Sequence, residues 1–127
     1  MKLSKKLLFI PAGLFFLWLI LSLGTKDFIF INDTHVSGQS MEPALHDGEW
    51  IFLSSKKPEI GDIIAFDCLA EKCRNGETNK GRVKRIIDID HYNCLYVLGD
   101  NREHSNDSAD YGWLCPADIK IDGVVIQ

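Results

Sequence analysis

The feature that most constrains this chain is a long stretch near its start that carries no charge. Residues 7–25 form a run of 19 uncharged residues, rich in Leu, Phe and Ile. At about 1.5 Å per residue, a helix of that length just spans the roughly 30 Å hydrocarbon core of a bilayer. Lys2, Lys5 and Lys6 precede the run, and positive charge stays on the cytoplasmic side of a membrane. We therefore expect one transmembrane helix in the lipid bilayer, with its N-terminus inside and the following residues outside the cytoplasm.

A cleaved secretory signal is the alternative interpretation of the same stretch. It would explain the basic start, the apolar middle and the small residues within positions 22–24. The run is longer than the ~7–15 apolar residues usual in such a signal, which favours an uncleaved anchor. Under both interpretations residues 1–25 are the cytoplasmic start and membrane segment, and residues 26–127 are one extracytoplasmic domain.

The domain of residues 26–127 is acidic. It carries 11 basic and 18 acidic residues, a net charge of −7. A domain that binds nucleic acid presents a basic face, so this balance argues against nucleic acid as a partner. The length suits one small domain with a single core.

Short apolar runs separated by turn signals follow one another through this domain. Several short β-branched runs at this spacing are typical of a sandwich or barrel, so the predicted fold class is mostly β. One helical turn is expected at residues 41–45, and the polar stretch 71–81 is expected to be an exposed loop. The expected strands cover residues 26–34, 50–53, 63–66, 83–89, 94–98 and 123–126.

Four cysteines lie in the exported domain, at positions 68, 73, 94 and 115. An even count in an oxidising compartment favours disulfides. Of the three pairings we prefer Cys68–Cys73 with Cys94–Cys115, because the first bond would pin the ends of a polar loop. Free buried thiols and a zinc site are the alternatives, but the spacings lack the paired C-x2-C form of zinc sites, and we expect no metal.

Three stretches carry residues suited to chemistry, at positions 37–45, 81–87 and 99–108. Ser40 lies near a glycine on a tight bend, where backbone N–H groups can form an oxyanion hole. Lys84 lies in an apolar run whose alternation puts it on one face with Ile86 and sends Val83, Arg85 and Ile87 to the other. Burial there would lower the pKa of the amine toward the range in which a lysine serves as a base. Taken singly, the same residues also fit a plain turn and a solvated lysine at a sheet edge.

In this order, the three stretches resemble the conserved boxes of bacterial type I signal peptidases, membrane-bound serine proteases with a Ser–Lys dyad. The box S-G-x-S-M-x-P is similar to residues 37–43, the lysine box to Lys84-Arg85, and the box G-D-N-R-x-x-S-x-D-S to residues 99–108. The resemblance implies a compact signal-peptidase-like β fold with one N-terminal transmembrane helix. It implies a serine endopeptidase of the bacterial plasma membrane, without cofactor, that cleaves signal peptides from exported preproteins after small residues.

By position, the resemblance makes Ser40 the nucleophile and Lys84 its general base. The Ser40 hydroxyl would attack the scissile carbonyl and give its proton to the neutral amine, which would pass it to the leaving amine. Gly38 stands where some members carry a hydroxyl that serves as a second oxyanion donor. Oxyanion binding by the Ser40 N–H alone, or with another group, therefore remains open.

The resemblance also implies supporting residues around the dyad. Ser105 would hold the lysine amine toward the nucleophile, and Asp107 is the acid of the same box. Asp100 with Arg85 would form a structural ion pair. Ala109 stands where the family often has arginine, so the usual partner of Asp107 is expected to be missing.

The substrate implied by the resemblance is an extended peptide with small side chains, added as a β-strand to an exposed edge. An apolar rim near Trp50 or Trp113 would rest on the bilayer, as tryptophans at membrane interfaces do. The residues expected to line the substrate pockets are Met41, Pro43, Ile51, Phe52, Ile63 and Ile64.

Three other functions stay open. Only residues 86–94 separate the lysine from the next expected strand, so most of the family's second β domain is missing. The chain could therefore be a specialised maturation or conjugative-transfer peptidase of the same superfamily. An inactive relative that binds signal peptides is the non-enzyme alternative. A Ser-His-Asp hydrolase is the third, with His104 near Asp107 in the sequence.

Overall fold

The computed structural model describes residues 12–22, 34–77 and 81–127. Helix α1 covers Ala12–Ser22, which is 11 residues of the expected 19-residue membrane span. No helix within these described ranges is both long enough and apolar enough to cross a membrane. The two ends of the expected span, and nearly all of the strand expected at residues 26–34, lie outside the described residues.

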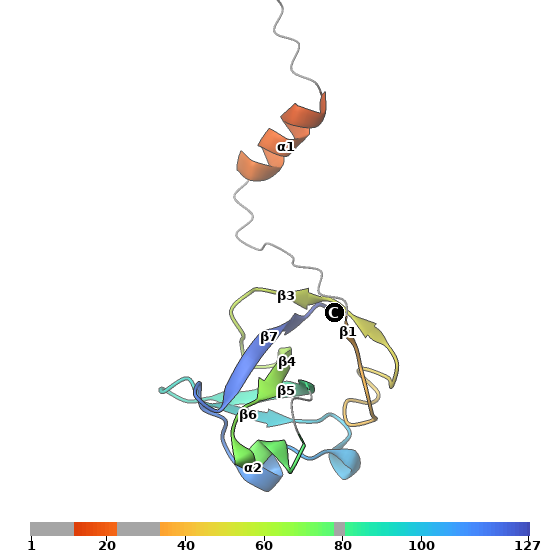
Figure 1. Cartoon of the computed structure of the whole chain (residues 1–127). Coiled ribbons are helices and arrows are strands. Elements are labelled where there is room, and N and C mark those ends of the chain that lie inside the picture. Colours follow the sequence, from red (N-terminus) through yellow and green to blue (C-terminus); the bar gives the residue numbers. More distant parts are fainter. Residues whose placement is uncertain (1–11, 23–33, 78–80) are drawn as a thin grey trace, which may run out of the picture.

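The described domain is mostly β, as the short apolar runs predicted (Figure 1). One sheet has two strands in the order β1-β2, and the other has five in the order β3-β7-β4-β5-β6, with every neighbouring pair antiparallel. Each expected run from residue 50 onward contains or overlaps a strand. The strands are β1 (Thr34–His35), β2 (Trp50–Ile51), β3 (Leu53–Ser54), β4 (Ile63–Cys68), β5 (Gly81–Ile89), β6 (Leu95–Leu98) and β7 (Ile119–Val125).

Three short helical elements join the strands, namely α2 (Glu71–Arg74), the 3-10 turn η1 (Arg102–His104) and α3 (Ser108–Tyr111). The expectation of a loop throughout residues 71–81 was wrong at its start, where α2 forms. Cys73 on α2 is fully buried, because it is bonded to Cys68 at the end of β4. The second disulfide joins Cys94 to Cys115. Both bonds are those that the sequence analysis preferred, and they leave no cysteine available as a zinc ligand.

Strand β4 is buried on both of its faces. Ile64 and Phe66 pack in one apolar cluster with Ile86 of β5, whereas Ile63 and Ala65 pack in a second cluster. Such two-sided burial explains why β4 reads as a continuous apolar run in the sequence rather than as an alternating one. The second cluster also holds the turn that follows Ser40, through Met41 and Leu45, together with Val36, Ile51, Leu53 and Val125.

Strand β5 shows the predicted alternation. Lys84 and Ile86 are buried on one face, and Ile87 on the other face is exposed. On one side β5 pairs with β4 from Gly81 to Arg85, but on its other side β6 pairs only from Arg85 onward. Within the described ranges, no strand therefore pairs with the outer edge of residues 81–84.

Gly123 in β7 offers a direct test of this packing. An added Cβ there would lie 2.8 Å from the Leu53 Cβ and 3.0 Å from the Ser54 carbonyl oxygen. We expect Gly123→Ala to lower the free energy of unfolding by about 1–3 kcal/mol, because β3 must move away from β7. Urea denaturation of the detergent-solubilised chain measures this.

The matched control is Gly81→Ala on β5 of the same sheet. A Cβ there would meet only the Asp67 Oδ1, at an ordinary 3.7 Å. A Gly123→Ala variant as stable as the control would contradict the packing described for β3 and β7.

Candidate active site

Ser40 lies on a tight turn whose shape is set by its neighbours. Gly38 adopts a φ of +94°, a conformation that favours glycine, and its N–H donates to the Asp47 Oδ1 at 2.9 Å. After Ser40, the N–H of Leu45 donates to the Met41 carbonyl at 3.0 Å, which is the single helical turn expected there. Met41 is fully buried and anchors the turn, while Ser40 itself stays half-buried and reachable from solvent.

Residues of the third box bind the backbone of this turn. The Asn101 N–H donates to the Ser40 carbonyl at 2.9 Å, and the Asn101 side-chain amide donates to the Gln39 carbonyl at 3.0 Å. Gly99 packs so closely that an added Cβ would lie 2.6 Å from the Ser40 carbonyl oxygen and would also overlap the Ser105 side chain. The structure thus brings the first and third boxes into direct contact. It also explains why the third box begins with glycine, because a side chain there would overlap the Ser40 turn and Ser105.

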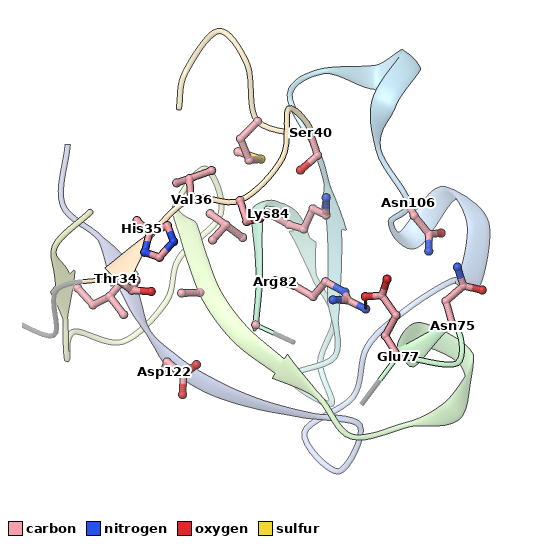
Figure 2. A pocket seen from close by; sticks show the side chains of 16 residues that line it. Thr34, His35, Val36, Ser40, Asn75, Glu77, Arg82, Lys84, Asn106 and Asp122 are labelled. Atoms are coloured by element: carbon pink, nitrogen blue, oxygen red, sulfur yellow. Dashed lines mark ion pairs between the residues drawn. The ribbon is translucent and has the colours of Figure 1, made fainter. Parts of the chain in front are cut away.

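Lys84 is 5% exposed, so the sequence-based prediction of a buried lysine is confirmed. Burial disfavours the charged amine and lowers the pKa of Lys84 to about 8. The Asp107 carboxylate acts in the opposite direction and raises this pKa, while Arg82 and Arg102 lower it further. Figure 2 shows the Lys84 amine directed toward the Ser40 side chain in the same cleft.

Asp107 is fully buried and is the centre of a hydrogen-bond network. Its Oδ2 accepts from the Gly99 N–H at 2.9 Å and from the Ser105 hydroxyl at 2.6 Å, and its Oδ1 accepts from the Ala109 N–H at 3.0 Å. Burial alone would raise the pKa of Asp107, but these hydrogen bonds and one from Arg102 outweigh it and lower the pKa. Asp107 is therefore a buried carboxylate that fixes the Ser105 side chain and the end of β6.

Asp107 has a basic partner, although Ala109 stands where the family often has arginine. The Arg102 guanidinium reaches the Asp107 Oδ2 at 2.5 Å from the same loop, five residues before it. The sequence analysis looked for this arginine beyond the D-S pair and overlooked the one inside the box. The expected pair of Asp100 with Arg85 is confirmed, with two contacts of 2.9 and 2.8 Å between the side chains.

Ser40 and Lys84 line one cleft of about 1060 Å³. Part of its lining is apolar, formed by Val36, Met41, Leu53, Ala65 and Val83. The open edge of β5 at residues 81–84 borders the same cleft. Figure 2 shows Arg82, Glu77, Asn75 and Asn106 on one side of the cleft, and Thr34, His35 and Asp122 on the other.

Of the six residues expected to line the substrate pockets, only Met41 borders the cleft. Ile51, Ile63 and Ile64 lie in the two apolar clusters of the core, while Pro43 and Phe52 face solvent elsewhere. The cleft instead takes Val83, the neighbour of Lys84, and Ala65, which pairs with Val83 across β4 and β5. The sequence does not specify this register between β4 and β5. Knowing the register would have identified Val83 and Ala65 as cleft residues.

The charge of Asp107 makes a prediction for stability. Because folding lowers its pKa, the carboxylate stabilises the fold above its unfolded pKa of about 4, and this stabilisation disappears as the pH falls through the lower, folded value. We expect Asp107→Asn to lower the free energy of unfolding at pH 7 by about 2–4 kcal/mol. Urea denaturation between pH 7 and pH 2 should show this difference shrinking below about pH 4.

Glu103→Gln is the control for Asp107→Asn, because it removes an exposed acid from the same loop. A stability difference between Asp107→Asn and the wild type that stays constant down to pH 2 would contradict a charged, buried Asp107.

Comparison with known proteins covers the part of the chain that carries the first two boxes. A model of the family described as signal peptidase, peptidase S26, matches residues 9–90. The match includes the Ser40 turn and Lys84, and it ends before the network around Asp107. No curated protein matches the chain. Because the family match covers well over half of the 127 residues, the chain belongs to the S26 signal peptidases and is a type I signal-peptidase-like protein.

Proposed function

We propose that this protein is a membrane-anchored endopeptidase that removes signal peptides, with Ser40 as nucleophile and Lys84 as general base. One observation carries the proposal: Lys84 is buried in the same cleft as Ser40, and its pKa is lowered to about 8. An ordinary lysine with a pKa of 10.5 would be almost wholly protonated near pH 8 and could not accept a proton. Burial removes this obstacle without a metal or a histidine.

The proposed reaction has two proton transfers in each half. The Ser40 Oγ attacks the scissile carbonyl carbon while its proton moves to the neutral Lys84 Nζ, and the resulting ammonium protonates the departing amine nitrogen. The acyl group then remains on the Ser40 Oγ as an ester. Water attacks this ester while its proton moves to Lys84 Nζ, and the ammonium returns a proton to the Ser40 Oγ as the product acid leaves. The Ser40 N–H has no acceptor among the described residues and is the proposed oxyanion donor. The Gly38 N–H donates to Asp47 instead, which argues against it as the second donor.

The cleft supports an extended substrate with small side chains. No described strand pairs with the outer edge of β5 at Val83 and Lys84, so an extended substrate could add there as a strand, beside Ser40. The apolar lining from Met41, Ala65 and Val83 would receive the small side chains before the scissile bond. The same features would also serve a relative that binds signal peptides without cutting them.

We further propose that residues 7–25 anchor the protein in the bacterial plasma membrane, with the catalytic domain on the extracytoplasmic side. The support is the uncharged run itself and the three lysines before it. Such an anchor would hold the cleft near the bilayer, where a translocated signal peptide ends.

A dedicated substrate is the second candidate function. The cleft carries an ion pair between Arg82 and Glu77, 3.4 Å apart, on the segment that follows the Cys68–Cys73 disulfide. Charged groups beside the apolar part of this cleft favour particular substrate side chains over others. A specialised maturation peptidase would use them to select one substrate.

Cleavage of a model preprotein with an Ala-x-Ala site tests the dyad. We expect the detergent-solubilised wild type to cut after this site, and Ser40→Ala and Lys84→Ala to lose at least about a thousandfold in kcat/KM while remaining folded. His104→Ala should stay within several-fold of the wild type, which would exclude His104 as the base. Full activity of Lys84→Ala would contradict the proposal, whereas a wild type that cuts only its own dedicated substrate would favour the second candidate.

The lowered pKa of Lys84 predicts the pH profile of that cleavage. Only the neutral amine can act as base, so kcat/KM should rise about tenfold per pH unit below the pKa and level off above it. With a pKa of about 8, the half-maximal value is expected near pH 8. A profile that still climbs at pH 10, or one that is flat from pH 6 to 9, would contradict a buried lysine base.

A further inference from the structure

We propose that Arg102 is a positioning residue that sets the protonation of Lys84 by neutralising the buried carboxylate of Asp107. The inference rests on the proposed function in one respect, because it assumes that the neutral Lys84 amine is the useful form. Its structural basis is independent of that assumption.

One oxygen atom, the Asp107 Oδ2, connects Arg102 with Ser105 and with the Gly99 N–H. Leu98 pairs with Arg85 in the antiparallel pair of β6 and β5, so Gly99, which follows β6, lies across from Lys84. The Arg102 Nη1 lies 2.5 Å from the Asp107 Oδ2 and donates also to the Gly99 carbonyl at 3.3 Å. The same Oδ2 accepts the hydroxyl proton of Ser105. Asp107 is fully buried, whereas the Arg102 side chain is 47% exposed, so Arg102 brings a compensating charge from the surface to a carboxylate that water cannot reach.

Three charged side chains act on the Lys84 amine, and Arg82 disfavours its ammonium form as Arg102 does. The Asp107 carboxylate favours the ammonium form of Lys84, and the Arg102 guanidinium disfavours it. With Arg102 in place the Arg102–Asp107 ion pair is nearly neutral, and desolvation is the main influence on the pKa of Lys84. Without Arg102 the uncompensated charge of Asp107 would stabilise the ammonium form and raise the pKa of Lys84.

A purely structural role for Arg102 is the alternative. Asp107 would keep three other hydrogen bonds, from Ser105, Gly99 and Ala109, if the guanidinium were removed. We therefore expect the fold to survive the loss of Arg102, and the effect to fall on the titration of Lys84. A structural role predicts the opposite, a loss of stability without a change in that titration.

The test is a direct titration of Lys84 in the full chain in detergent micelles. The 13C shift of its Cε, assigned by the absence of the signal in Lys84→Met, follows the protonation of the amine whether or not any peptide is cut. The variant is Arg102→Gln, which keeps a hydrogen-bond donor but removes the charge. The matched control is Lys57→Ala, which removes a positive charge from an exposed position away from this cleft.

We expect Arg102→Gln to raise the pKa of Lys84 by about half a pH unit to one pH unit, and the control to leave it unchanged. The value of kcat/KM at pH 7 should then fall about three- to tenfold, while the plateau at high pH stays at the wild-type level. Arg102→Lys should titrate like the wild type. Arg102→Gln with Ala109→Arg should recover part of the change, because the Ala109 N–H already contacts Asp107 and its side chain is exposed.

A Lys84 pKa in Arg102→Gln equal to that of the wild type would overturn the proposal, as would an equal loss of kcat/KM at every pH. If Arg102→Gln does not fold, Arg102→Lys with a raised pKa would overturn it equally. If the wild type cuts no peptide but the Lys84 pKa responds to Arg102 as expected, the proposed function fails and this inference stands.

Discussion

The exclusion of water from one amine is the constraint on which the site depends. Lys84 shares a strand face with Ile86, and that face is part of the apolar core. A protonated amine there is poorly solvated, so its pKa falls to about 8. The Asp107 carboxylate still favours the ammonium form, and Arg102 binds the same carboxylate. In the mechanism that we propose, burial and this charge balance supply the base.

Much of the fold follows from local patterns in the sequence, and the remainder depends on contacts between distant residues. The β-branched run at residues 83–89 is a strand in the structure, with its alternation as expected. Helices α2 and α3 have four residues each, too few to show a helical period. In α2 a disulfide and a buried Cys73 hold the turn in place, and in α3 the Asp107 side chain caps the helix.

The site divides in the same way. Ser40 and Lys84 could be chosen from the sequence because three stretches, taken in order, resemble the signal peptidase boxes. Taken singly, each residue also fits a plain turn or a solvated lysine. The cleft lining could not be chosen in this way, since both neighbours Ile63 and Ile64 are apolar and both are buried, in different clusters, away from the cleft. Which residue borders the cleft is decided by the register between β4 and β5. The partner of Asp107 was missed because Arg102 reaches it through the fold of η1 and not through a fixed sequence offset.

The most direct test of the central claim is to locate the nucleophile chemically. The full chain in detergent would be treated with an acylating active-site probe at pH 8, and the modified residue would be identified by mass spectrometry. Our account expects one adduct, on Ser40, which forms in the wild type but not in folded Lys84→Ala. An adduct on another residue, or labelling of Ser40 at the same rate without Lys84, would contradict a serine activated by a buried lysine.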